Sequence, residues 1–160
     1  MTDGRPAIYT AEAHVTGGRA EGHGRTSDGA LEVDLRMPEE MGGTGGGTNP
    51  EQLFAVGYAA CFESALGAVA RRGRQETGDV AVDSKVMLVP TQDRGFTLTV
   101  VLAVTLPSVE DPEAVELVRA AHQVCPYSNA TRGNIDVSLT ANGRDVEEVS
   151  ERATEEQHAG

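Results

Sequence analysis

The chain has 160 residues, which fits a single domain with one hydrophobic core. It carries 13 Lys and Arg against 25 Asp and Glu, so its formal net charge is −12, and such a surface repels the phosphates of nucleic acids. The two cysteines, Cys61 and Cys125, are too few for a disulfide-dense secreted scaffold or a four-cysteine zinc site.

The sequence favours a cytoplasmic protein with no membrane partner. Its first residues contain no apolar stretch as long as that of a signal peptide. The longest nearly apolar run, 53–62, is about half as long as a membrane helix needs. In a reducing compartment, an isolated cysteine pair is more often catalytic, redox-active or buried in the core than a permanent disulfide.

The first third of the chain predicts short strands joined by glycine turns. Residues 7–15 alternate loosely, as strands do, 17–30 contain several turns, and the apolar residues of 31–35 alternate again. The glycine-rich run 41–49 has neither the lysine nor the glycine spacing of the common phosphate-binding loops. We therefore expect a flexible connection or a mobile lid there.

A helix is predicted over residues 50–72. Asn49 is a good N-cap, Pro50 suits the first helical position, and Glu51 complements the positive end of the helix dipole. Apolar residues recur at helical spacing around more than half of the circumference, among them Phe54, Tyr58, Cys61 and Phe62. Interspersed Ala and Gly residues let another backbone approach, so this helix is expected to be central and buried.

The rest of the chain predicts a hairpin, a second helix and a last strand. Apolar residues alternate over 80–88 and 96–106, on either side of a turn. A cap followed by proline opens the second helix at Asp111, and Pro126 ends it, which places Cys125 at its C-terminal end. A final strand follows over 135–139, and the order of elements indicates an α+β domain.

We expect this domain to span residues 1–143. The remaining residues, 144–160, are acidic and lack a strong apolar stripe, so they predict a frayed helix or disorder.

The two cysteines each close the apolar stripe of a predicted core helix. One such cysteine alone is usually an inert small apolar residue, but two that meet can form a redox pair. A reactive thiolate then needs a nearby cation, for which composition alone does not distinguish Arg5, Arg19, Arg25 and Arg36. His122 lies three residues before Cys125, so a Cys–His nucleophile is an alternative, while the four histidines show no metal-ligand spacing.

Two segments resemble the cysteine motifs of the organic hydroperoxide resistance proteins, in the osmotically inducible protein C superfamily. They are NPEQLFAVGYAACF, at 49–62, and AHQVCPYSNATRGNI, at 121–135. The resemblance extends over about residues 8–139. It implies antiparallel sheets packed around two central helices in an intertwined homodimer.

The resemblance also implies a thiol peroxidase without metal, haem or flavin. Cys61 matches the peroxidatic cysteine and Cys125 the resolving one, while Arg19 matches the arginine that stabilises the thiolate and Glu51 the acid that holds it. The implied substrates are alkyl and lipid hydroperoxides, and the implied reductants are lipoylated proteins or other dithiols. Apolar neighbours of Cys61 are candidates for the substrate pocket, with core packing as the alternative: Phe54, Tyr58, Phe62 and Tyr127.

Helix geometry adds one expectation of its own. In an unbroken helix, Glu51 and Cys61 lie about 15 Å apart along the axis and about 80° apart around it. Unless the arginine lies lengthwise between them, Glu51 cannot hold one that touches Cys61 of the same helix. We therefore expect the Arg19–Glu51 pair to complete the Cys61 site of a partner subunit.

Some residues depart from the resemblance. The segment between the first helix and the hairpin is shorter than expected, the acidic tail has no counterpart, and Glu63 beside the cysteine is unexpected. Two other classes of function remain as alternatives. One is a Cys–His hydrolase, and the other is a redox sensor or binding module without turnover.

Overall fold

The computed structural model describes residues 3–147 of the chain. The chain divides into two compact units, Met1–Leu53 and Phe54–Gly160, called here the N-terminal and the C-terminal unit. Helix α1 (Pro50–Arg72) begins in the first unit and continues through the second.

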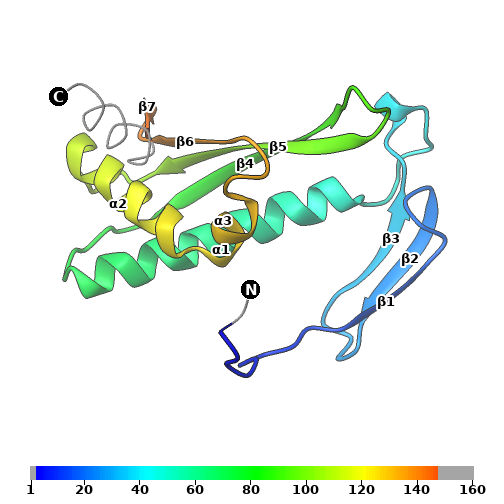
Figure 1. Cartoon of the computed structure of the whole chain (residues 1–160), viewed down its shortest axis with the longest axis horizontal. Helices are drawn as coiled ribbons and strands as arrows, with labels where there is room; N and C mark the ends of the chain where they lie inside the picture. The colour runs from blue at the N-terminus through cyan, green and yellow to red at the C-terminus, as the bar shows by residue number, and fades with distance from the viewer. Residues whose placement is uncertain (1–2, 148–160) are drawn as a thin grey trace. The chain divides into compact units, whose positions relative to one another are not determined.

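The N-terminal unit is a three-stranded antiparallel sheet with strands in chain order (Figure 1). Its elements are β1 (Ala13–Thr16), β2 (Glu21–Thr26), β3 (Glu32–Arg36) and the short 3-10 helix η1 (Glu39–Met41). The first strand is shorter than the alternating pattern of residues 7–15 suggests, because only its last residues pair with β2.

The glycine-rich run packs closely against β3. The Thr48 amide donates to the Asp34 carbonyl at 2.9 Å, and a Cβ atom at Gly47 would lie 2.6 Å from the same oxygen. A Cβ atom at Gly43 would lie 2.1 Å from the Met37 carbonyl oxygen. These glycines therefore allow backbone-to-backbone packing where a larger residue would clash.

Helix α1 has the predicted bounds and the predicted start. The Asn49 side chain accepts a hydrogen bond from the Gln52 amide at 2.8 Å, which confirms Asn49 as the cap. By length and composition alone, α1 could cross a membrane. A core helix passes the same test, and Tyr58, Phe62 and Leu66 of α1 are fully buried in the core.

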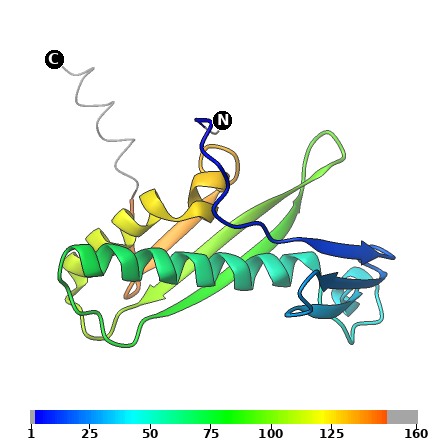
Figure 2. The same cartoon turned by 90° about the horizontal axis from the view of Figure 1, so that it is seen from below.

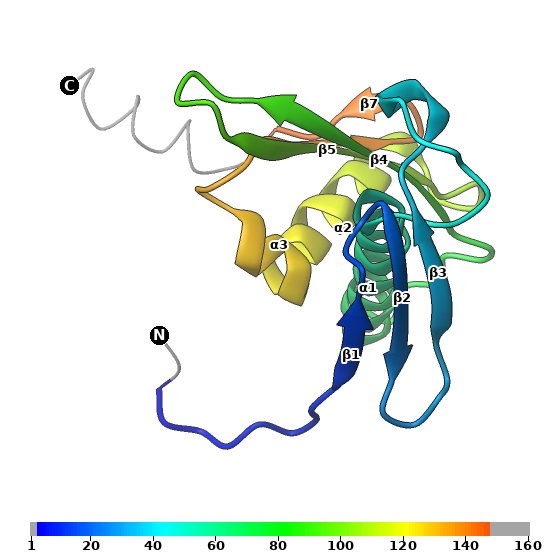
Figure 3. The same ribbon diagram turned by 90° about the vertical axis from the view of Figure 1, so that its right-hand side faces the viewer.

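The C-terminal unit is a four-stranded sheet with three helices on one face (Figures 1 and 3). Figure 2 shows α1 running along the sheet, in front of the long β4–β5 hairpin. The other elements are β4 (Ala81–Pro90), β5 (Phe96–Thr105), α2 (Asp111–Val124), α3 (Pro126–Thr131), β6 (Val137–Ala141) and β7 (Arg144–Asp145).

This sheet is mixed, which corrects the expectation of purely antiparallel sheets. β4 and β5 form the predicted antiparallel hairpin, but β6 pairs with β5 in parallel. The reason is the connection: α2 and α3 carry the chain back along one face of the sheet, so it enters β6 in the direction of β5.

The core of the C-terminal unit lies between this sheet and the helices. Val100, Leu102 and Val104 of β5 face the buried side chains of α1 and α2. Ordered structure continues past residue 143, because β7 pairs with β6 and Val146 is buried. The expectation of a frayed tail is therefore wrong for residues 144–147, and the rest of that tail lies outside the described residues.

Candidate active site

The two cysteines meet in the C-terminal unit. Their sulfur atoms lie 3.6 Å apart, and both thiols are free. Cys61 lies in the middle of α1 and is half-buried, whereas Cys125 lies between α2 and α3 and is fully buried. Cys125 has extended backbone angles because Pro126 disfavours a helical residue before it, and this turn directs the chain back toward α1. The pair can close to a disulfide with a small movement.

The surroundings of Cys61 within this unit favour the neutral thiol. Burial raises the pKa of Cys61, and the neighbouring Cys125 raises it further, while a hydrogen bond with the Tyr127 backbone acts in the opposite direction. A thiolate at neutral pH therefore requires a cation that lowers this pKa.

Three aromatic rings cluster along the two turns of α1 that precede Cys61. The ring centroids of Phe54, Tyr58 and Tyr127 lie 5.6 to 5.9 Å from one another. Tyr127 crosses α1 over Gly57, where an added Cβ atom would lie 2.8 Å from the tyrosine hydroxyl. Gly57 and Cys61 are four residues apart and share one face of the helix, so the Tyr127 ring covers the turn beside the sulfur.

The four residues predicted to line a substrate pocket differ in exposure. Phe54 is half-buried and Tyr127 is 37% exposed, so both present ring surface. Tyr58 and Phe62 are fully buried among the core side chains. Their substrate role stays a prediction, and Glu63 is exposed on the helix.

A buried polar network adjoins the cysteines, and sequence reasoning missed two of its members. The Tyr58 hydroxyl bonds to Ser128 Oγ at 2.9 Å and to Thr131 Oγ1 at 3.1 Å. Ser128 Oγ also bonds to His122 Nδ1 at 2.8 Å. The polar run after Pro126 was the available signal, because Ser128 and Thr131 at i and i+3 share one face of a short helix.

Arg19 and Glu51 form a two-pronged ion pair in the N-terminal unit. The arginine Nη2 and Nη1 atoms donate to the two carboxylate oxygens at 2.9 and 3.1 Å. This hydrogen bonding lowers the pKa of Glu51 and raises that of Arg19. The carboxylate thus fixes the plane of the guanidinium group and leaves its other edge available to an anion.

The turn between β1 and β2 positions Arg19. Gly17 and Gly18 both have positive φ angles, and a Cβ atom at Gly17 would lie 2.4 Å from the Glu21 carbonyl oxygen. Two of the other candidate arginines are occupied elsewhere, since Arg36 donates to backbone carbonyls and Arg5 pairs with Asp3.

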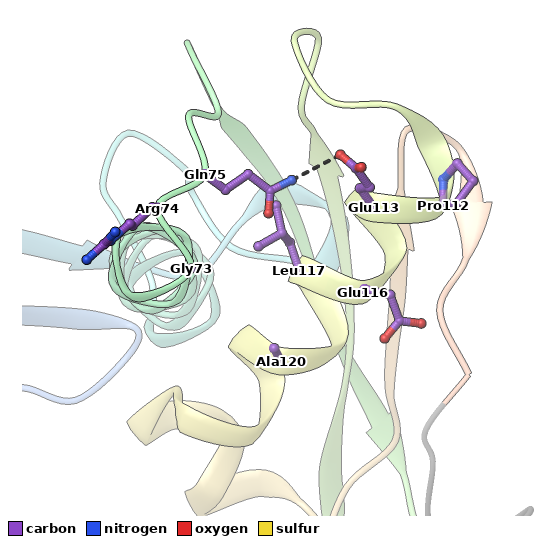
Figure 4. A pocket seen from close by; sticks show the side chains of 8 residues that line it. All are labelled: Gly73, Arg74, Gln75, Pro112, Glu113, Glu116, Leu117 and Ala120. Carbon is purple, nitrogen blue, oxygen red and sulfur yellow. Dashed lines mark hydrogen bonds between the residues drawn. The ribbon is translucent and has the colours of Figure 1, made fainter.

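A separate, open cavity of about 730 Å³ lies between the end of α1 and the first turns of α2 (Figure 4). Gln75 and Glu113 face each other across it and are joined by a hydrogen bond of 3.2 Å. The cavity lining contains neither cysteine. Within residues 3–147, no group of three or more His, Cys, Asp or Glu side chains is arranged to hold a metal ion.

Comparison with known proteins places the chain in a family. Residues 43–140 match the family model described as OsmC-like protein. The organic hydroperoxide resistance protein of Xanthomonas axonopodis pv. citri is 51% identical over 88% of this chain and 99% of its own length. The chain belongs to the organic hydroperoxide resistance proteins of the OsmC-like family.

Solved structures of this family share the fold. An organic hydroperoxide resistance protein from Legionella pneumophila is 53% identical, with a TM-score of 0.81 over 84% of this chain and 97% of that one. Another from Vibrio cholerae is 47% identical, with a TM-score of 0.84 over 89% of this chain and 98% of that one. Membership of this family connects the chain with resistance to organic hydroperoxides and oxidative stress.

Proposed function

We propose that the chain is a thiol peroxidase that reduces organic hydroperoxides to alcohols. The observation that carries this proposal is the sulfur pair, with two free cysteines whose sulfur atoms lie 3.6 Å apart, one half-buried and one fully buried. The half-buried Cys61 is accessible to a peroxide, whereas the buried Cys125 is protected from direct oxidation. The pair therefore suits sequential roles, with Cys61 peroxidatic and Cys125 resolving.

The chemistry proceeds in two steps. The Cys61 thiolate attacks one oxygen of the hydroperoxide and the O–O bond breaks, so that the sulfur becomes a sulfenic acid and the departing alkoxide takes a proton to give an alcohol. Cys125 then attacks the Cys61 sulfur and the S–O bond breaks. The hydroxyl leaves with the Cys125 proton as water, and a disulfide remains.

The ion pair of Arg19 and Glu51 supplies the cation that the thiolate needs. A guanidinium group held by a carboxylate presents fixed N–H donors and a positive charge, which stabilise the thiolate and the developing alkoxide. Because burial raises the pKa of Cys61, this contribution matters most near neutral pH.

We infer that the ion pair acts on Cys61 of a second copy of the chain. Helix α1 is unbroken, so Glu51 and Cys61 are about 15 Å apart along its axis. Side chains on a helix also lean toward its N-terminus, which carries the Glu51 carboxylate away from Cys61. In the most apolar 18-residue stretch of α1, only 22% of the residues are buried, and Val56 is 71% exposed, which leaves apolar helix surface for a homodimer contact.

Mixing two inactive variants tests this arrangement. Glu51→Ala and Cys61→Ser subunits are refolded together, and peroxidase activity is compared with that of each variant alone. If the pair acts across a dimer, one heterodimer site contains wild-type Cys61, Arg19 and Glu51, so activity returns. Mixed subunits that stay inactive, despite forming heterodimers, would overturn the arrangement.

The surroundings of Cys61 favour an apolar substrate and a slender reductant. Phe54 and Tyr127 present ring surface beside the helix turn that carries the sulfur, which suits alkyl and lipid hydroperoxides better than hydrogen peroxide. A dihydrolipoyl dithiol on a flexible arm can reach a half-buried disulfide. A reducing cytoplasm, which maintains such dithiols, is the compartment we propose.

Peroxide consumption with a defined reductant tests the function. Wild type is supplied with cumene hydroperoxide and dihydrolipoamide and is expected to turn over many times. Cys61→Ser should consume peroxide at the uncatalysed rate, while Cys125→Ser should still complete the first oxidation. Sustained turnover by Cys61→Ser would refute the proposal, and so would failure of wild type with every dithiol tried.

A further inference from the structure

The Tyr58 hydroxyl lies at the centre of the buried network beside the cysteine pair. We propose that Tyr58 is a positioning residue for disulfide formation, because its hydroxyl fastens α3 to α1 and so holds the Cys125 sulfur within reach of Cys61. This inference rests on the proposed peroxidase function and assigns a residue to its second step.

The location of the hydrogen bonds carries the inference. Tyr58 is three residues before Cys61 on α1, while its partners Ser128 and Thr131 are three and six residues after Cys125. The two bonds therefore connect the helix of one cysteine to the segment that follows the other. All three side chains are less than 9% exposed, so water does not compete freely for these bonds.

The segment that follows Cys125 is also bonded to α2, so hydrogen bonds hold the turn at Cys125 from two sides. Ser128 Oγ bonds to His122 Nδ1, and Arg132 donates to the His122 carbonyl oxygen. Arg132 also donates to Asn129 Oδ1 at 2.9 Å. These contacts set the shape of the turn between α2 and α3, and the Tyr58 hydroxyl sets the position of that turn against α1.

Placement matters because the second step is a reaction between two sulfur atoms of one chain. They are 3.6 Å apart, and a disulfide bond is about 2.05 Å long, so the step requires a short and directed approach. A misplacement of about 1 Å can slow such an oriented reaction by about 100-fold. The first step needs no such approach, since peroxide reaches Cys61 from outside the protein.

The test separates the two steps in a single turnover. Full-length wild type and Tyr58→Phe, both reduced, receive one equivalent of cumene hydroperoxide without a reductant. Samples are quenched over time, dimedone traps the sulfenic acid, and intact-mass and peptide spectra quantify the trapped Cys61 and the disulfide. Tyr58→Phe should oxidise Cys61 within about twofold of the wild-type rate and form the disulfide about tenfold more slowly.

Two further variants sharpen the result. Tyr9→Phe makes the same chemical change at a tyrosine that is 77% exposed, and should leave both steps unchanged. Thr131→Val removes one of the two partners and should slow only disulfide formation, by less than Tyr58→Phe does. If Tyr58→Phe does not fold, the rate of disulfide formation in Thr131→Val tests the positioning role in its place.

The outcomes are distinct. Disulfide formation at the wild-type rate in the folded Tyr58→Phe and Thr131→Val variants overturns the positioning role while the peroxidase proposal stands. Equal slowing of both steps also overturns it, because a general structural defect acts on both. A wild type that forms neither sulfenic acid nor disulfide refutes the peroxidase proposal itself, and this inference with it.

Discussion

The two units of the chain are each stabilised internally by different interactions. In the C-terminal unit, a continuous core joins the sheet to α1 and α2, contains Cys125 and packs against one side of Cys61. Among the described residues of the N-terminal unit, Leu35 is the one buried apolar side chain, and strand pairing, close glycine contacts and polar bonds define the structure. Cys61 and Cys125 are thus positioned by packing, whereas Arg19 and Glu51 are positioned by turns and hydrogen bonds.

Truncating a buried leucine in each unit should produce the largest difference between them. Leu102→Ala empties a fully buried position of β5 and should lower the free energy of unfolding by about 2–5 kcal/mol. Leu35→Ala acts outside the main core and should cost about 1–2 kcal/mol. Urea unfolding followed by circular dichroism measures both. Equal losses would mean that the N-terminal unit contains a core of comparable strength.

Removing the cation should affect chemistry and leave the core intact. Arg19→Ala should reduce the thiolate fraction of Cys61 near neutral pH by about 10- to 1,000-fold, and the rate of the first oxidation with it. Because the thiol is the inactive form, the rate should rise again with increasing pH. Stopped-flow oxidation from pH 6 to 10 measures this profile.

The matched control is Arg25→Ala, which removes a 60% exposed arginine from the neighbouring strand β2. It should leave the profile within twofold of wild type. An Arg19→Ala profile that coincides with wild type would assign the activation of Cys61 to another group.

Much of the fold could be predicted because its signals are local. Asn49 and Pro50 mark the start of α1, and alternating apolar residues mark the β4–β5 hairpin. The parallel partner of β5 could not be predicted, since period-two alternation identifies a strand but not its neighbour. Gly43 and Gly47 suggested a flexible loop, because close backbone packing leaves no signal beyond the glycine itself.

The residues of the candidate site also divide into those that the sequence identifies and those that it does not. Cys61 and Cys125 drew attention as two cysteines on core helices, but the choice of Arg19 over other arginines depended on the resemblance, because exposed arginines look alike in a sequence. The bond between Tyr58 and Ser128 spans 70 residues and could not be predicted from either segment. Polar partners that meet only through tertiary packing leave no periodic pattern.

A smaller effect is expected from a substitution at Gly57, where the Tyr127 ring lies against the backbone of α1. Gly57→Ala would place a Cβ atom 2.8 Å from the Tyr127 hydroxyl, so the ring must move from the turn beside Cys61. The KM for cumene hydroperoxide should rise several-fold, while the helix gains up to about 1 kcal/mol from alanine. Gly67→Ala is the control, since its Cβ atom meets only the flexible end of Arg71 at 3.2 Å. Equal KM values in both variants would show that the position of the Tyr127 ring does not affect substrate binding.

The smallest expected effect is the contribution of the Arg19–Glu51 ion pair to the free energy of unfolding. Arg19 and Glu51 are partly exposed, at 38% and 16% of their side chains, so their bond contributes up to about 1 kcal/mol. Since folding lowers the pKa of Glu51, this contribution is present above about pH 4.3, the ordinary glutamate value, and is lost as pH falls through the lowered pKa. Urea unfolding of wild type and Glu51→Gln should therefore differ at pH 7 and converge in acid. A gap that persists at low pH would show that Glu51 stabilises the N-terminal unit by something other than its charge.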